Sequence, residues 1–250
     1  MSPPPSRSFP ALLLEGTAIV VSILLAFAIQ AAWETRQDAE LEDRALSTVL
    51  VELDYNLDVL TQSTRFHEAM RGASEAVLAL AHKSPGSLDE QEVDSLLAVL
   101  TWWRGTADWS TGALDALVAG GNLSAVGLDP LRAALAALPQ QLEDIRLNDE
   151  QDYRWFAEIY VPLLRERANL SQISAAVGQR PGSIDGYDFE PTPYLGPRTD
   201  HRPLIVSQPL QNAVLEKNWV EQDILGTYGL MRNRLERLRL MIQQEIGAPS

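Results

Sequence analysis

Residues 11–33 read ALLLEGTAIVVSILLAFAIQAAW. As a single helix this stretch is about 34 Å long, which is enough to cross a hydrocarbon core of about 30 Å. Trp33 ends the apolar run at a position where an indole ring favours the membrane–water interface. The stretch therefore predicts one transmembrane helix over residues 11–33. It leaves residues 1–10 as a disordered tail and residues 34–250 as the domain that the helix anchors.

Two polar residues, Glu15 and Gln30, interrupt this run, each about one turn from an end. An ionisable side chain within a membrane segment is by default a functional hypothesis. At this shallow depth the Glu15 side chain can also reach the headgroup region, and we favour this interpretation. We group Glu15, Gln30 and Trp33 as the membrane-anchor residues.

A cleaved signal peptide is the alternative, because Ala26-Phe27-Ala28 matches a small-x-small cleavage site. Three features favour a retained anchor instead. Arg7 is the only base before the run, Glu15 would lie inside the apolar region, and apolar residues continue beyond the supposed cut. The mature N-terminal sequence distinguishes the two possibilities.

Charge is distributed unevenly along the chain. Arg7 and Glu15 are the only base and the only acid before residue 34, so residues 34–250 carry the whole net charge of −14. Such a surface repels phosphate backbones, so we expect no nucleic-acid partner. The chain has no cysteine, which excludes disulfides, thiolate metal sites and cysteine nucleophiles.

Periodicity after Trp33 predicts an all-α protein. Five leucines repeat at spacings of 4-3-4-3 and predict that the membrane helix continues as a stalk to about His82, with a possible interruption near Gly72: Leu46, Leu50, Leu53, Leu57 and Leu60. A helix from Ser207 to about Ile246 shows the same repeat in Tyr228, Met231, Leu235, Leu238 and Ile242. We therefore expect an antiparallel helical bundle over residues 34–250, with a long Pro-rich loop at 178–207.

Charge suggests a register for this antiparallel pair. The last helix carries four arginines (Arg232, Arg234, Arg237 and Arg239), and the stalk base carries five acids (Glu34, Asp38, Glu40, Glu42 and Asp43). We expect the arginines to lie beside residues 34–45. Two separately solvated charged faces are the alternative.

Local signals divide the middle of the chain. Ser87 and Glu90 form a predicted capping box for a helix to about Arg104. A second helix over residues 111–119 should end in a left-handed cap at Gly120-Gly121. Asp129-Pro130 should begin a third helix that runs to about Val177, kinked or divided at Pro139 and Pro162.

Two segments resemble a bacterial family. The run from Glu15 through Leu24-Leu25-Ala26 to Trp33-Glu34, and the segment Ala116–Leu123 followed by Asp129, Leu131 and Arg132, resemble an uncharacterised bacterial family of single-pass membrane proteins. The resemblance covers most of the chain and implies a membrane-anchored helical domain without an assigned activity. This chain lacks the strongly basic flank that commonly follows the family's membrane helix.

Few residues indicate chemistry. His67, His82 and His201 lie in separate segments, and the acidic stretch 148–152 lacks the glycine turn of a calcium loop, so we assign no catalytic, metal or cofactor residues. Two groups are candidate interaction surfaces, with core packing as the alternative for each. They are Trp102, Trp103 and Trp109, and the loop residues Asp185, Asp188 and Tyr194.

These features favour a non-enzymatic, membrane-tethered interaction protein of scaffold, sensor or accessory type. The expected partners are the lipid bilayer and a protein or second copy, joined through the stalk and the small residues Ala18, Ser22 and Ala26 of the membrane helix. Alternatives are an envelope ligand-binding protein with a pocket under the 178–207 loop, and a hydrolase of unfamiliar type. We expect the protein in the bacterial inner membrane, with a slight preference for a periplasmic over a cytoplasmic domain. The basic residues on the two sides of the membrane helix favour neither orientation.

Overall fold

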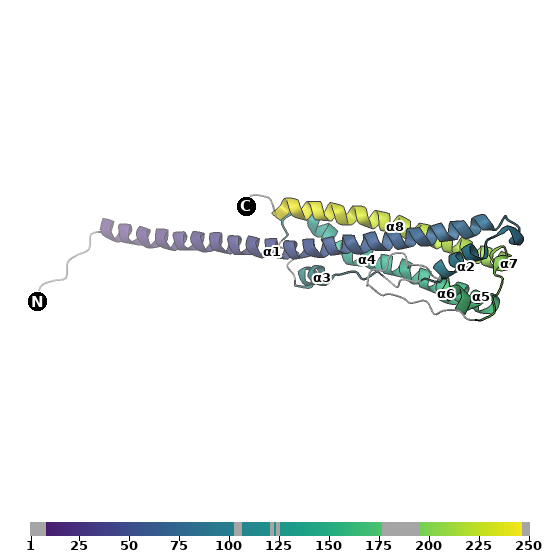
Figure 1. Cartoon of the computed structure of the whole chain (residues 1–250). Coiled ribbons are helices and arrows are strands. Elements are labelled where there is room, and N and C mark those ends of the chain that lie inside the picture. The colour runs from purple at the N-terminus through teal and green to yellow at the C-terminus, as the bar shows by residue number, and fades with distance from the viewer. Residues whose placement is uncertain (1–8, 103–106, 121–122, 124–125, 177–195, 247–250) are drawn as a thin grey trace, which may run out of the picture.

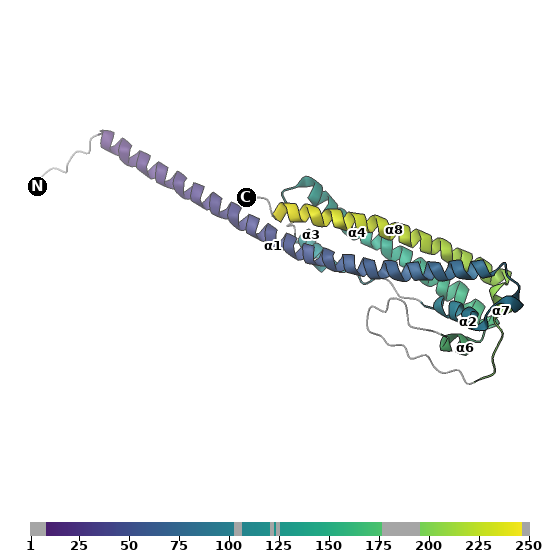
Figure 2. The ribbon, with the colours of Figure 1, turned by 45° about the horizontal axis from the view of Figure 1, so that its top comes forward.

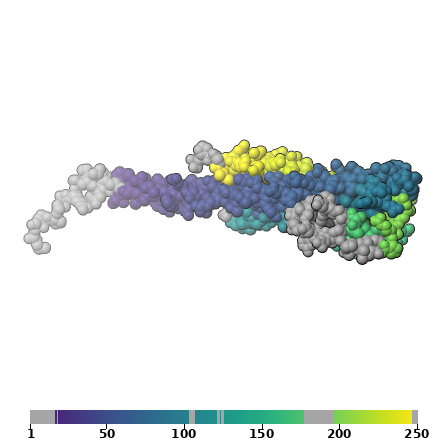
Figure 3. Space-filling model, viewed as in Figure 1, coloured from purple at the N-terminus to yellow at the C-terminus, as the bar shows by residue number. Residues whose placement is uncertain are grey.

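The computed structural model describes residues 9–102, 107–120, 123, 126–176 and 196–246, with residues 9–16 and 18 described by backbone alone. The protein is all-α, and no strand occurs in these ranges. Its dominant element is α1 (Phe9–Leu80), one helix of 72 residues. At 1.5 Å per residue α1 is about 110 Å long. It projects alone from a bundle at its C-terminal half (Figures 1 and 3).

Helix α1 has three consecutive parts. The described apolar side chains up to Trp33 are all exposed, and the region is apolar enough to span a membrane. Residues 34–45, which we call the neck, are exposed or half-exposed on all sides. From Leu46 onward one face is buried. The helix continues through Gly72 to Leu80 without interruption, so the break considered there does not occur.

Three long helices form the bundle: the second half of α1, α4 (Asp129–Arg154) and α8 (Gln208–Ile246). Helix α8 runs antiparallel beside α1, and α4 packs against α8 (Figures 1 and 2). The predicted repeat of α8 is confirmed, since all five of its residues from Tyr228 to Ile242 are buried. In the predicted stalk seam Leu46, Leu53 and Leu60 are buried and Leu50 and Leu57 are half-buried.

The predicted charge register of α1 and α8 is wrong. Arg239 pairs with Asp54 at 2.7 Å, and Arg232 donates to the Thr61 hydroxyl at 3.2 Å. Continuing that register places the end of α8 beside Leu46, so the neck lies beyond the reach of α8. The buried leucine and isoleucine side chains set this alignment, because burial of apolar area contributes more free energy of folding than exposed ion pairs do.

Helix α3 (Gly112–Ala119) lies against α1 near the start of the bundle. Glu52 of α1 accepts hydrogen bonds from the backbone N–H groups of Ala113 (2.7 Å) and Leu114 (3.1 Å) and from the Ser110 hydroxyl (3.1 Å). A carboxylate from another helix thus caps α3. At the other end Gly120 is right-handed, with φ −70° and ψ −4°, so it is not the left-handed cap that we predicted, and Gly121 lies outside the described residues.

The remaining short elements close the end of the bundle farthest from the neck: a 3₁₀ turn (Pro85–Ser87), α2 (Glu90–Val99), α6 (Leu170–Ala175) and α7 (Arg202–Ile205). The predicted capping box is wrong, because the cap of α2 is Asp89, which accepts from the Glu92 N–H at 3.0 Å. The Ser87 hydroxyl instead donates to the Ser84 carbonyl oxygen. Helix α2 ends at Val99, earlier than expected.

The helix predicted from Asp129 to Val177 is divided. Helix α4 begins at Asp129, after Leu128 as the cap residue, and continues through Pro139. A π-helical turn (Trp155–Tyr160) and α5 (Val161–Arg167) follow, with Pro162 at the start of α5. Pro162 has no backbone N–H and cannot donate a helical hydrogen bond, and the place of this missing bond coincides with the π turn. Most of the predicted loop at 178–207 lies outside the described residues, and its end forms α7.

Candidate functional site

A layer of buried polar residues crosses the three-helix bundle. Its members lie at positions where the heptad repeat places apolar residues, and we call this set the ionic layer: His67 from α1, Asp149 and Asp152 from α4, and Lys217, Glu221 and Tyr228 from α8. Lys217 is 1% exposed and Glu221 is 0% exposed. Charges so deeply buried are costly unless each finds a partner.

The partners are all present within the layer. Lys217 forms ion pairs with Asp152 and with Glu221, whose Oε1 atom lies 2.6 Å from Nζ. Glu221 Oε2 also accepts from His67 Nδ1 at 2.7 Å. Because an ionised carboxylate only accepts, Nδ1 carries the proton. The Lys217 ammonium also lies 5.1 Å from the centre of a Trp155 ring, within cation–π range.

Asp149 lies at the edge of the layer and joins it to the chain before α3. Its Oδ1 accepts from the Tyr228 hydroxyl at 2.8 Å, and its Oδ2 accepts from the Ala107 N–H at 3.0 Å. Burial raises the pKa of Asp149, and these two hydrogen bonds offset that rise only in part. The protonated form of Asp149 is therefore favoured more in the folded chain than in water.

The other two shifts in the layer go toward the charged forms. Burial lowers the pKa of Lys217, but the charges of Asp152 and Glu221 outweigh burial and leave that pKa raised. Burial likewise raises the pKa of Glu221. The hydrogen bond from His67 and the charge of Lys217 outweigh it, so the pKa of Glu221 lies below its usual value.

Three residues of the layer have the chemistry of metal ligands. Potential ligand atoms of His67, Asp152 and Glu221 lie within 4.8 Å of one another, the one such group in the described part of the chain. Lys217 Nζ already lies against both carboxylates. The ammonium thus supplies the positive charge that a divalent ion would otherwise bring to these carboxylates.

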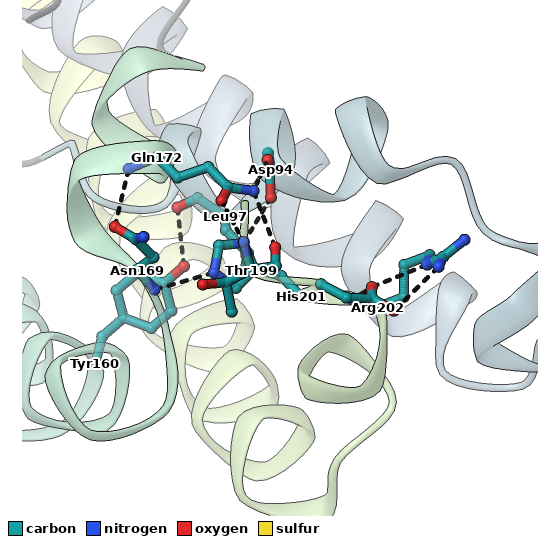
Figure 4. A network of polar contacts seen from close by, with 9 residues as sticks. Asp94, Leu97, Tyr160, Asn169, Gln172, Thr199, His201 and Arg202 are labelled. Carbon is teal, nitrogen blue, oxygen red and sulfur yellow. Dashed lines mark hydrogen bonds and ion pairs between the residues drawn. The ribbon is translucent and has the colours of Figure 1, made fainter. Parts of the chain in front are cut away.

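A second polar network, in which Asp94, Gln172 and His201 are buried, closes the end of the bundle far from the neck. We call it the distal clasp: Asp94 from α2, Asn169 and Gln172 at α6, and Thr199 and His201 before α7 (Figure 4). The Gln172 side-chain amide donates to Asp94 Oδ2 at 2.7 Å and to the Thr199 carbonyl oxygen at 3.0 Å. Its own oxygen accepts from the Thr199 N–H at 2.8 Å. One side chain thus joins three chain segments.

His201 lies at the centre of the clasp with both ring nitrogens engaged (Figure 4). The Asn169 N–H donates to Nε2 at 3.0 Å, so Nε2 is the unprotonated nitrogen. Nδ1–H then donates to Asp94 Oδ1 at 2.6 Å. An Asp–His pair of this kind resembles the orienting half of a catalytic triad, but here a backbone N–H takes the lone pair that would act as the base. The arrangement holds three chain segments together.

The residues singled out in the sequence lie elsewhere. Trp102 is 9% exposed and packs with Phe66 and Met70, and Trp109 is half-buried against the main core, so both contribute to packing. Trp103, Asp185, Asp188 and Tyr194 lie outside the described residues, as does the Glu15 side chain. In the anchor group, Gln30 donates to Glu34 at 2.9 Å, and Trp33 is 70% exposed.

Sequence reasoning missed both buried networks. A signal for the ionic layer was present, because extending the α8 repeat backward from Tyr228 by steps of four and three places Glu221 and Lys217 in the seam. The distal clasp has no comparable signal. Its members come from α2, α6 and a segment without regular structure, so no sequence periodicity relates them.

Comparisons of this chain with protein-family models, with characterised proteins and with solved structures found no match. The function must therefore be argued from the fold and from these two networks.

Proposed function

We propose that this chain is a membrane-anchored adaptor, of scaffold or sensor type, that holds a three-helix rod away from a bilayer for contact with a protein partner. The observation that carries the proposal is the continuity of α1 from an exposed apolar stretch into the bundle core. A soluble helix buries its apolar face, whereas the first part of α1 exposes apolar side chains on every side. A bilayer is the environment in which that surface is stable.

The outer face of α8 supports contact with a partner. Four large apolar side chains lie on it away from the core: Leu215, Trp219, Leu230 and Leu240. Trp219 is 58% exposed although the same helix buries the cationic side chain of Lys217. Exposed aromatic and leucine residues along one helix face are typical of protein interfaces. The partner is a protein of the same membrane or a second copy of this chain.

Alkaline carbonate extraction of cell membranes tests the anchor. The full chain should stay in the membrane pellet, and a chain without residues 11–33 should move to the supernatant. Extraction of the full chain into the supernatant, or the appearance of a mature protein that begins after Ala28, would exclude a retained anchor.

Site-specific photo-crosslinking in intact cells tests the contact surface. A photoreactive phenylalanine analogue at Trp219 or Leu230 should give a discrete adduct, at twice the chain mass for a second copy. The matched control is the same analogue at Glu68, an exposed position on α1. Absence of adducts at both α8 positions, or equal adducts at position 68, would reject α8 as the contact face.

A further inference from the structure

The hydrogen bonds that His201 can make depend on whether its ring is protonated. The neutral ring has one N–H, which donates to Asp94, and one lone pair, which accepts from the Asn169 N–H. A protonated ring has two N–H groups and no lone pair. Protonation therefore preserves the bond to Asp94 and turns the contact with Asn169 into two N–H groups facing each other at 3.0 Å.

The groups around His201 favour this outcome. Asp94 of α2 attracts a positive ring, and the side chain is fully buried beside it. Asp200 lies next in the chain but is bound by Arg202, which also pairs with Glu90 of α2 at 3.1 Å. The described contacts on the α6 side of the ring are the Asn169 N–H and the Gln172 amide, which carry no charge. A proton on His201 thus draws the ring toward α2 and pushes α6 away.

We propose that the distal clasp is an acid-sensitive switch, in which protonation of His201 releases the N-terminal end of α6 from the segment before α7. The lost contact joins residues 32 positions apart, and after its loss the described contacts leave Gln172 alone to hold α6 in the clasp, through Asp94 and Thr199. Ile173 of α6 is buried in the distal core with Leu97 and Ile205. Release of α6 exposes this apolar side chain, which gives the rod a surface in acid that it lacks at neutral pH.

This inference extends the sensor reading of the proposed function by naming the proton as the signal. Histidine is the side chain that ordinarily changes charge between about pH 5 and 8. The ionic layer responds differently, because His67 donates to Glu221 and faces no backbone N–H in its described contacts. The two buried histidines therefore differ: the described partner of His67 is a carboxylate, which a protonated ring still contacts favourably, whereas the Asn169 N–H that faces His201 repels a protonated ring.

Hydrogen–deuterium exchange of the full chain in lipid nanodiscs tests the switch. Peptides covering residues 169–176 are compared at about pH 7.5 and about pH 5.5, with labelling times scaled for the intrinsic exchange rate. We expect protection of this segment to fall about tenfold in acid, which is the effect of losing one hydrogen bond. His201→Gln keeps an oxygen acceptor and cannot be protonated, so it should remove the acid response. His82→Gln, at an exposed histidine outside both networks, is the matched control and should leave that response unchanged.

Equal protection of residues 169–176 in the wild-type chain at both pH values would overturn the proposal. So would an acid response in His201→Gln as large as that of the wild type. If that variant is already open at neutral pH, imidazole ¹⁵N spectra of the wild-type chain decide, with exposed His82 as the reference. Protonation of His201 over the pH range in which α6 opens supports the switch, and protonation without opening rejects it. Carbonate extraction measures only whether the chain is anchored in the membrane. Its result and the exchange result therefore distinguish failure of the proposed anchor from failure of the proposed switch.

Discussion

Single residues in the ionic layer determine whether burial of charge is tolerated. Lys217 is the only group that pairs with both Asp152 and Glu221, and it does so at almost zero exposure. A complete buried ion network contributes little net free energy of folding, because desolvation offsets attraction. Removing one member is different, since it leaves the opposite charges buried without a partner.

Replacing Lys217 by methionine should therefore destabilise the chain strongly. We expect the free energy of unfolding to fall by about 3–5 kcal/mol, which is typical when a buried charge loses its partner. Urea denaturation of the full chain in detergent, followed by circular dichroism, measures the change. Lys83, the only other lysine, is exposed, and Lys83→Met should change stability by less than about 0.5 kcal/mol. Similar losses in the two variants would contradict the pairing.

Glu221 should make the stability of the chain depend on acid. Its pKa is lowered in the folded state, so its contribution is present above the ordinary glutamate value of about 4.3 and is lost as the pH falls through the folded value. Asp149, whose pKa is raised, acts in the opposite sense and favours the folded chain as it takes up a proton. Glu221→Gln should consequently be less stable than the wild type near neutral pH but lose less stability below about pH 4.5.

Urea midpoints measured at a series of pH values test this dependence, with the exposed Glu40→Gln variant as the control. A Glu221→Gln curve parallel to that of the wild type would show that another carboxylate causes the acid loss.

At the scale of elements, the long helices and the short helix α3 could be predicted, whereas the ends of α2 and of the helix that follows Asp129 could not. The heptad repeats of α1 and α8 extend over many turns, so an error at one position hardly affects the pattern. Helix α2 and the predicted helix to Val177 depend on single capping and proline signals, and the structure departs from the sequence predictions at both. Tertiary contacts decide such ends. Asp89 and not Ser87 caps α2, and the helix predicted to Val177 continues through Pro139 and ends at Arg167, although the expected change at Pro162 is present as a π turn.

Helix α3 illustrates this dependence, because its N-terminal cap comes from another helix. Glu52→Ala removes the acceptor of two backbone N–H groups and one hydroxyl. We expect a loss of about 1–3 kcal/mol and faster amide exchange over residues 112–119. Exchange mass spectrometry with urea denaturation measures both effects.

Glu68→Ala, at an exposed position of α1, serves as the control for that cap. If residues 112–119 exchange at the wild-type rate in Glu52→Ala, then α3 is held by its apolar contacts through Leu114 and Leu117 and not by the carboxylate.

For the whole molecule, the register of α8 against α1 leaves most of the neck without a packing partner, and its contacts lie near its end, where Glu42 accepts from the Gly127 N–H at 3.0 Å and Ala45 packs against the main core. The predicted pairing of the α8 arginines with residues 34–45 would have brought the bundle down to the end of the apolar stretch. Arg239 instead lies at Asp54. The neck, residues 34–45, is thus a stretch of helix about 18 Å long, exposed or half-exposed on all sides, between the apolar stretch and the bundle. Five of its side chains are acidic, and in the proposed membrane-anchored arrangement anionic headgroups repel such a surface, which favours a bundle held away from the bilayer.

A rigid neck predicts that the height of the bundle above the bilayer depends on the length of the neck. Inserting one helical heptad after Asp38 adds two turns and should raise the far end of the rod by about 10 Å while nearly preserving its rotation. Energy transfer from a dye at residue 83, beyond the end of α1, to acceptor lipids in a nanodisc should fall accordingly. A flexible insertion of seven glycine and serine residues at the same place should broaden the distances without a uniform rise, because such a segment behaves as a random coil. If the two insertions give the same transfer efficiency, the neck is not a continuous helix at the membrane, and the bundle's height is set by contacts other than α1.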